Sequence, residues 1–98
     1  MPAPVYLGDE VSAAGFRLAG ALVRTPRPGE EATALAWARA NAPLVLVSAT
    51  VAAGAGEALM RAAQSTLSPL VLVLPDPDGA VPVPDIAARL RTQLGRQP

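Results

Sequence analysis

Residues 4–10 read Pro-Val-Tyr-Leu-Gly-Asp-Glu, and residues 15–20 read Gly-Phe-Arg-Leu-Ala-Gly. The short apolar run Val-Tyr-Leu predicts a β-strand, and the Gly-Asp-Glu that follows it predicts a turn into a helix. Gly20 is placed to end this helix as its C′ residue, because glycine adopts a left-handed backbone at little cost. A strand, a turn and a helix in this order indicate the first βα unit of an open α/β domain.

The same alternation of strand and helix patterns continues along the chain. Further strands are predicted at residues 21–24, 44–47 and 70–74, and further helices at residues 30–41, 55–66 and 85–94. The last two strands are apolar without alternation, which is typical of parallel strands covered on both faces. We therefore expect a receiver-like (flavodoxin- or Rossmann-like) α/β domain over residues 1–78, with a four-stranded parallel sheet and helices on both faces. Residues 79–98 are expected to be a Pro-containing linker and a C-terminal helix.

The composition narrows the classes of function. The chain has 98 residues, 51% of them hydrophobic, but no apolar run reaches the ~20 residues of a membrane span. We therefore expect a cytoplasmic protein without membrane insertion. It contains no cysteine and no histidine, which excludes disulfides and removes the commonest general base. The eight basic and eight acidic residues cancel, so nothing suggests nucleic-acid binding.

The first helix carries an apolar stripe at helical spacing, which we expect to face the sheet: Val11, Ala14, Gly15 and Leu18. Phe16 and Arg17 would then point away from the sheet, where aromatic and arginine side chains are enriched in protein interfaces. The alternative is that Phe16 folds over the edge of the sheet or beneath the last helix. Trp37 lies opposite Leu35 on the second helix, so one of these two side chains must face outward.

Sites in such a sheet lie at the carboxyl ends of its strands. Asp9 and Glu10 follow the first strand and could hold a hard cation, but two adjacent acids more often cap a helix and complement its dipole. Ser48, Thr50 and Ser65 have no histidine to activate them and are interpreted as turn and cap residues. We expect no catalytic residue, no metal and no cofactor.

The sequence lacks the motifs of phosphotransfer by receiver domains and of nucleotide binding. A receiver needs a phospho-accepting Asp after the third strand, where this chain has Ser48, and a late lysine, which it lacks. No G-x-G-x-x-G follows the first strand and no P-loop is present. These observations favour a binding role.

The two motifs together resemble the F subunit family of the V-type and archaeal A-type rotary ATPases. They are the Gly-Asp-Glu turn at Gly8, Asp9 and Glu10 and the Gly-Phe-Arg-Leu-Ala-Gly segment from Gly15 to Gly20. The paired glutamates at residues 30–31, the Pro-Asp-Pro-Asp-Gly turn after the fourth strand and the C-terminal helix agree with that family.

The resemblance implies a noncatalytic component of the central stalk, bound to the coiled-coil D subunit of the stalk and peripheral to the membrane. The stalk couples ATP hydrolysis or synthesis to proton or sodium transport. Partner contacts are expected at Phe16, Arg17, Ile86 and Leu90, and residues 79–98 are expected to reach the catalytic head subunits A and B. The alternative is a stand-alone receiver-like domain that binds a small ligand or a cation without phosphotransfer activity.

Overall fold

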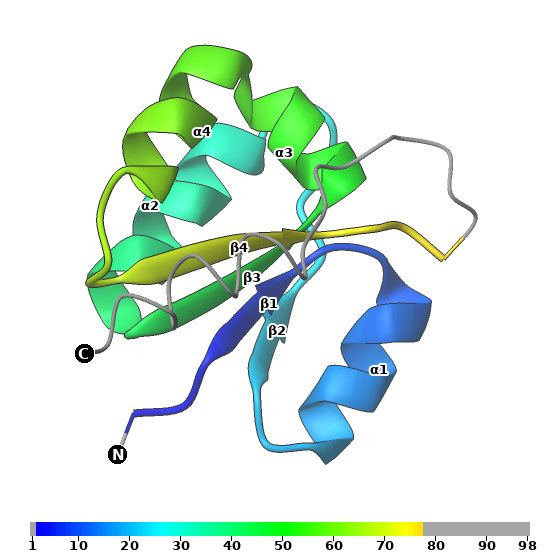
Figure 1. Ribbon diagram of the computed structural model, residues 1–98. Coiled ribbons are helices and arrows are strands. Elements are labelled where there is room, and N and C mark those ends of the chain that lie inside the picture. The colour runs from blue at the N-terminus through cyan, green and yellow to red at the C-terminus, as the bar shows by residue number, and fades with distance from the viewer. Residues whose placement is uncertain (1, 78–98) are drawn as a thin grey trace.

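In the computed structural model, residues 2–77 are described, and they form a four-stranded parallel sheet with helices on both faces (Figure 1). The strands are β1 (Val5–Leu7), β2 (Leu22–Arg24), β3 (Leu44–Ser48) and β4 (Leu70–Leu74), and the helices are α1 (Glu10–Leu18), α2 (Glu31–Asn41), α3 (Ala49–Ala55) and α4 (Glu57–Gln64). This confirms the predicted α/β receiver-like class. The expected C-terminal helix, with Ile86 and Leu90, lies outside the described residues.

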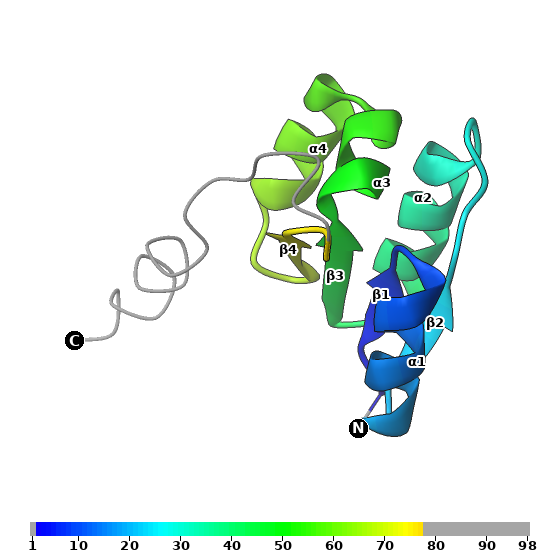
Figure 2. The same ribbon diagram turned by 90° about the vertical axis from the view of Figure 1, so that its right-hand side faces the viewer.

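The sheet order is β2-β1-β3-β4, and every neighbouring pair is parallel. α1 packs on one face, against β1 and β2 (Figures 1 and 2). α2, α3 and α4 form a layer on the opposite face. Of the helices in residues 2–77, none has both the length and the apolar character that crossing a bilayer requires.

The hydrophobic core lies between the sheet and the layer of α2, α3 and α4. Strand alternation sends the valines of β3 and β4 into this core, whereas the leucines of the same strands point to the α1 side. The buried core side chains are Val5, Leu7, Leu35, Ala38, Ala42, Val45, Val47, Val51, Met60, Ala63 and Val71.

Gly20 ends α1 as predicted from the sequence. It has a φ of 102°, and its N–H donates to the carbonyl of Arg17 at 3.1 Å. The next residue, Ala21, donates its N–H to the carbonyl of Phe16 at 2.9 Å. These two bonds form a Schellman motif, which satisfies carbonyls that the helix end leaves open.

The orientation of α1 differs from the prediction. Val11 is 81% exposed and Leu18 is 91% exposed, and Ala14 and Gly15 are exposed between them. Phe16 instead faces the sheet and stacks on the ring of Tyr6 in β1, with the ring centroids 4.5 Å apart. The predicted sheet-facing stripe was therefore wrong. Stacking removes apolar surface of both aromatic rings from water, and it adds ring–ring attraction that an aliphatic stripe cannot provide.

The helix expected at residues 55–66 is α4, and a second helix that was not predicted, α3, precedes it at Ala49–Ala55. The side chain of Ser48 caps the start of α3 by accepting the N–H of Val51 at 3.2 Å. Gly56, with a φ of 100°, then separates α3 from α4. A left-handed residue cannot continue an α-helix, so the chain restarts α4 in a new direction at Glu57.

Two glycines, Gly15 within α1 and Gly20 just after it, should respond in opposite directions to replacement by alanine. Gly20→Ala should lower the free energy of unfolding by about 1–3 kcal/mol, because alanine is strained at positive φ. Gly15→Ala should raise it by up to about 1 kcal/mol, because Gly15 is helical and a Cβ there meets nothing within 4 Å. Urea unfolding of both variants measures the difference. Equal stabilities would contradict the assignment of the turn.

Candidate functional site

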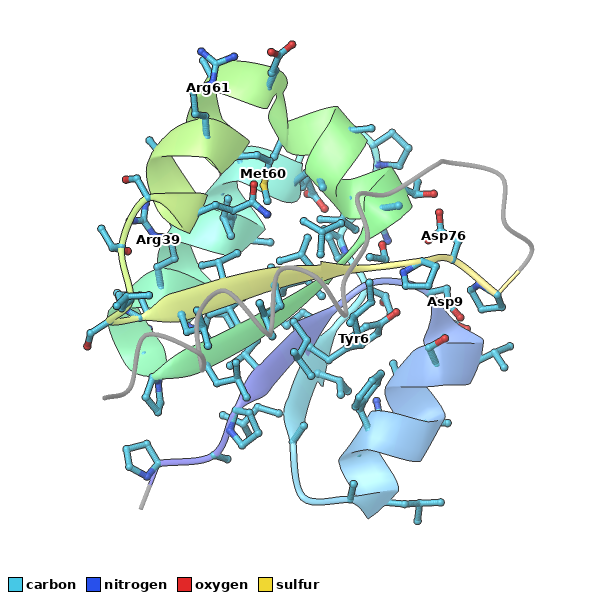
Figure 3. The ribbon with its side chains drawn as sticks, viewed as in Figure 1. Tyr6, Asp9, Arg39, Met60, Arg61 and Asp76 are labelled. Carbon is cyan, nitrogen blue, oxygen red and sulfur yellow. The ribbon has the colours of Figure 1, made fainter. Side chains whose placement is uncertain are left out.

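The carboxyl ends of β1 and β3 border the crevice where a doubly wound sheet places its ligands. In the sheet, β2 lies on one side of β1, and β3 and β4 lie on its other side. The order of the strands therefore reverses between β1 and β3, and this is where such a crevice forms. A cavity of about 410 Å³ is open here. It is lined by Gly8, Asp9, Val11, Pro26, Ser48, Thr50, Val51, Asp76 and Pro77. Figure 3 shows Asp9 and Asp76 at this end of the sheet, with Tyr6 beneath them.

Asp9 is the N-cap of α1, and both of its carboxylate oxygens are engaged. Oδ2 accepts the N–H of Ser12 at 2.8 Å, and Oδ1 accepts the hydroxyl of Tyr6 at 2.9 Å. The hydrogen bond from the Ser12 N–H is the main cause that lowers the pKa of Asp9 below its usual range. Glu10 follows in the first helical turn and is exposed. The helix-capping interpretation of Asp9 is confirmed.

Tyr6 links the crevice to the interior of the fold. Only 2% of its surface is exposed, its ring stacks on Phe16, and its hydroxyl donates to Asp9. Burial, with the nearby Asp9 carboxylate adding to it, raises the pKa of Tyr6 to about 12. The phenol is therefore a neutral hydrogen-bond donor and is not a base at neutral pH.

Gly8 forms the floor of the crevice and leaves no room for a larger residue. A Cβ at this position would overlap the hydroxyl of Tyr6 and would lie 2.9 Å from Cβ of Ser48. Its N–H donates to the carbonyl of Arg24 at 3.1 Å, which extends the pairing of β1 and β2 by one residue. The Gly-Asp-Glu turn is therefore required by close packing and capping.

The hydroxyl residues singled out in the sequence also have structural partners. Ser48 caps α3, as predicted, and Ser65, which lies outside the crevice, ends α4 with its Oγ donating to the carbonyl of Ala62 at 2.7 Å. Thr50 donates its Oγ1–H to Oδ2 of Asp76 at 2.6 Å. This bond joins the start of α3 to the segment after β4. Sequence reasoning placed Asp76 at a strand end but found no signal for its pairing with Thr50.

The carboxylates of the described chain do not gather into a metal site. Within residues 2–77, no three side chains of histidine, cysteine, aspartate or glutamate are grouped so that they could hold an ion. Asp9 turns its oxygens to Tyr6 and Ser12, and Asp76 accepts from Thr50.

A second, more open cavity of about 690 Å³ lies between the end of β2 and the start of α2. The guanidinium of Arg24 lies over the ring of Trp37 here, 4.0 Å from the ring centroid. Leu35 is 1% exposed on the core side of α2, so Trp37 is the outward member of the pair that the sequence left open. Trp37 is half-buried and packs against the core from its edge.

The structure separates the residues that the sequence singled out for partner binding. Phe16 is half-buried against Tyr6, whereas Arg17 is exposed on α1. Ile86 and Leu90 fall outside residues 2–77. The exposed apolar residues of α1, Val11 and Leu18, were predicted to face the sheet, and their exposure is the feature that sequence reasoning missed. The apolar stripe itself was visible in the sequence, but its direction was not.

No protein-family model matches the chain, and no curated protein matches it either.

The sole tyrosine of the chain makes the contact between β1 and α1 measurable. The phenolate absorbance should titrate near pH 12 in the folded protein, against about 10 in the unfolded chain. Because the folded-state pKa is the higher one, the stability that Tyr6 contributes is present below pH 10. It is lost as the pH rises toward 12.

Asp9→Asn should lower this midpoint but leave it above 10, because the negative charge is removed while burial remains. Absorbance at alkaline pH measures the titration, and circular dichroism at the same pH verifies the fold. An unchanged midpoint in folded Asp9→Asn would contradict the contribution of the Asp9 carboxylate.

Proposed function

We propose that this protein is a noncatalytic central-stalk component of a V-type or A-type rotary ATPase, equivalent to the F subunit, which binds the coiled-coil D subunit of the stalk. In this role it helps couple ATP hydrolysis or synthesis to proton or sodium transport, in the cytoplasm and peripheral to the membrane. The observation that carries the proposal is the outward apolar face of α1. This face belongs to the same Gly-Asp-Glu and Gly-Phe-Arg-Leu-Ala-Gly segments that resemble the family.

The outward face of α1 has the form of a helix-docking surface. Val11, Ala14, Gly15 and Leu18 recur at spacings of three and four residues and are all exposed. The small residues in the middle let a second helix approach closely, and the larger ones at the ends can fit between its side chains. Glu10 and Arg17 lie seven residues apart, about two turns, on the same side of this face, and they supply polar groups for a rim.

The expected partner surface is therefore refined. Phe16 supports it from below, by holding α1 on β1 through the stack with Tyr6. Val11 and Leu18 take the direct contact with the coiled coil, and Arg17 keeps the role inferred from the sequence. The contact of residues 79–98 with catalytic head subunits A and B stays part of the proposal.

Leu18→Glu should weaken binding to the coiled-coil stalk partner at least tenfold and leave the fold intact, because a 91% exposed side chain has few contacts to lose. Leu67→Glu is the matched control, since Leu67 is also apolar and exposed (57%) but lies between α4 and β4. The measurement is co-expression with the coiled-coil partner followed by size-exclusion chromatography and a binding isotherm.

Co-elution of the wild-type chain and Leu67→Glu with the coiled-coil partner, with loss of Leu18→Glu, supports both the partner and the surface. Unchanged binding of the Leu18→Glu variant would show that the interface with the coiled-coil partner does not include the outer face of α1. Separate elution of the wild-type chain from a folded coiled-coil partner would overturn the stalk assignment.

The crevice at the ends of β1 and β3 favours a second candidate, a domain that binds a small ligand or a cation. Its cavity of about 410 Å³ has the size of a small-molecule pocket and contains two carboxylates. A ligand that binds only the folded state raises the melting temperature. Millimolar magnesium, with and without a nucleotide, should therefore shift the midpoint under this candidate, whereas the stalk proposal expects no shift.

A further inference from the structure

β2 is an outer strand of the sheet, and its free edge can accept another strand. The sheet order β2-β1-β3-β4 places β1 on one side of it and no strand of residues 2–77 on the other (Figure 2). Leu22 donates its N–H to the carbonyl of Pro4 at 2.9 Å, and the carbonyl of Arg24 accepts the N–H of Gly8 at 3.1 Å. Successive residues of a strand turn their backbone groups to opposite edges, so the N–H and the carbonyl of Val23 point outward.

The side chain of Arg24 lies at this edge with its donors free. Its guanidinium rests on the ring of Trp37, 4.0 Å from the ring centroid, and makes no hydrogen bond or ion pair with any residue that the structure describes. Stacking on an aromatic face holds the planar guanidinium in one place but leaves the N–H groups along its rim open. A fork of N–H donors matches the two oxygens of a carboxylate.

The cavity of about 690 Å³ opens beside this arginine, between the edge of β2 and α2. Arg24 lines the cavity, and Thr25 and Thr33 add hydroxyl groups to it. The register pairs Val23 with Tyr6, whose ring is on the α1 face of the sheet. By alternation, Arg24 and the residue opposite it in an added strand then point to the α2 face. The side chain of that added residue would therefore enter the cavity.

The charges around the cavity leave a place for one more carboxylate. Glu30 lines the cavity, and its Oε1 accepts the backbone N–H of Arg27 at 3.2 Å. Glu31 accepts the N–H of Gly29 at 2.8 Å with its own Oε1 and is not part of the lining. Neither carboxylate comes within ion-pair distance of Arg24, so in the described part of the chain this positive charge has no counter-charge.

These features favour an acidic strand as the occupant. A short edge strand that carries a charged residue resists pairing with a copy of itself. β2 has an arginine and no acidic residue, so a second copy of β2 would bring a like charge instead of a carboxylate. A helix cannot use the outward backbone groups of Val23, because its own N–H and carbonyl groups are already bonded. An extended segment can use them, and peptides are recognised by main-chain pairing of this kind.

We propose that the edge of β2 and the adjoining cavity bind an extended acidic segment of another protein. The segment pairs with Val23 as an added strand, and one of its carboxylates enters the cavity and accepts hydrogen bonds from the guanidinium of Arg24. This binding does not rest on the stalk assignment, because the outer face of α1 takes no part in it.

Two peptides test this proposal on the whole 98-residue chain. Both are acetylated and amidated, and their sequences are Thr-Val-Glu-Val-Thr and Thr-Val-Gln-Val-Thr. Trp37 is the sole tryptophan, so its fluorescence reports binding beside Arg24, and protection of the Val23 amide from hydrogen exchange reports the added strand. The variants are Arg24→Gln and, as the matched control, Arg27→Gln. The control removes the same charge from an exposed arginine that does not line the cavity.

The glutamate peptide should change the fluorescence of Trp37, protect the amide of Val23 and bind at least tenfold more tightly than the glutamine peptide. Arg24→Gln should remove this preference, whereas Arg27→Gln should keep it. Circular dichroism verifies that each variant is folded. The comparison of the two peptides on the unmodified chain keeps the test decisive if Arg24→Gln is unstable.

Three results would overturn the proposal. The first is an amide of Val23 that stays unprotected at millimolar concentrations of the glutamate peptide. The second is equal affinity for the two peptides, or a preference that Arg27→Gln removes as fully as Arg24→Gln, which would indicate charge attraction without a site. The third is protection of Val23 without peptide that increases with protein concentration, together with a dimer in light scattering, which would identify a second copy as the occupant of the edge.

Discussion

The burial of β1 on both faces and along both edges is the constraint on which the rest of the structure depends. Val5 and Leu7 enter the core beneath α2, while Tyr6 points to the opposite face. β1 also hydrogen-bonds to β2 on one edge and to β3 on the other. A buried phenol needs a hydrogen-bond partner, because an unpaired one would lose its water without compensation. Asp9 provides that partner and at the same time caps α1, so one carboxylate sets where the first helix begins.

The strands were predictable from the sequence because their apolar runs are short and bounded by glycine, proline or charge. The runs at residues 44–47 and 70–74 were placed within one residue of β3 and β4. The start of α1 and its end at Gly20 followed from capping chemistry, which is local. The division of residues 49–64 into two helices was not predicted, because a glycine near a helix end gives no measure of its backbone angle.

Predicting which face of α1 meets the sheet would have required knowing which residue of another element it packs against. The periodicity of Val11, Ala14, Gly15 and Leu18 defines a stripe, but the ring of Tyr6 decides that Phe16 and not this stripe meets the sheet. The bond between Thr50 and Asp76 was unpredictable for a similar reason, since 26 positions separate the two residues. The local roles of Asp9 and Ser48 as caps were predicted, because each is satisfied within three residues.

α1 is fixed at both ends, by the Asp9 cap at its start and by the Gly20 turn at its finish. The stack of Phe16 on Tyr6 fixes its rotation about its own axis. A helix held in this way is preorganised: its backbone is already ordered before any other molecule arrives. A partner that docked on its outer face, as proposed, would lose little conformational entropy there beyond that of a few side chains, and the energy gained by removing water from Val11 and Leu18 would be retained as affinity.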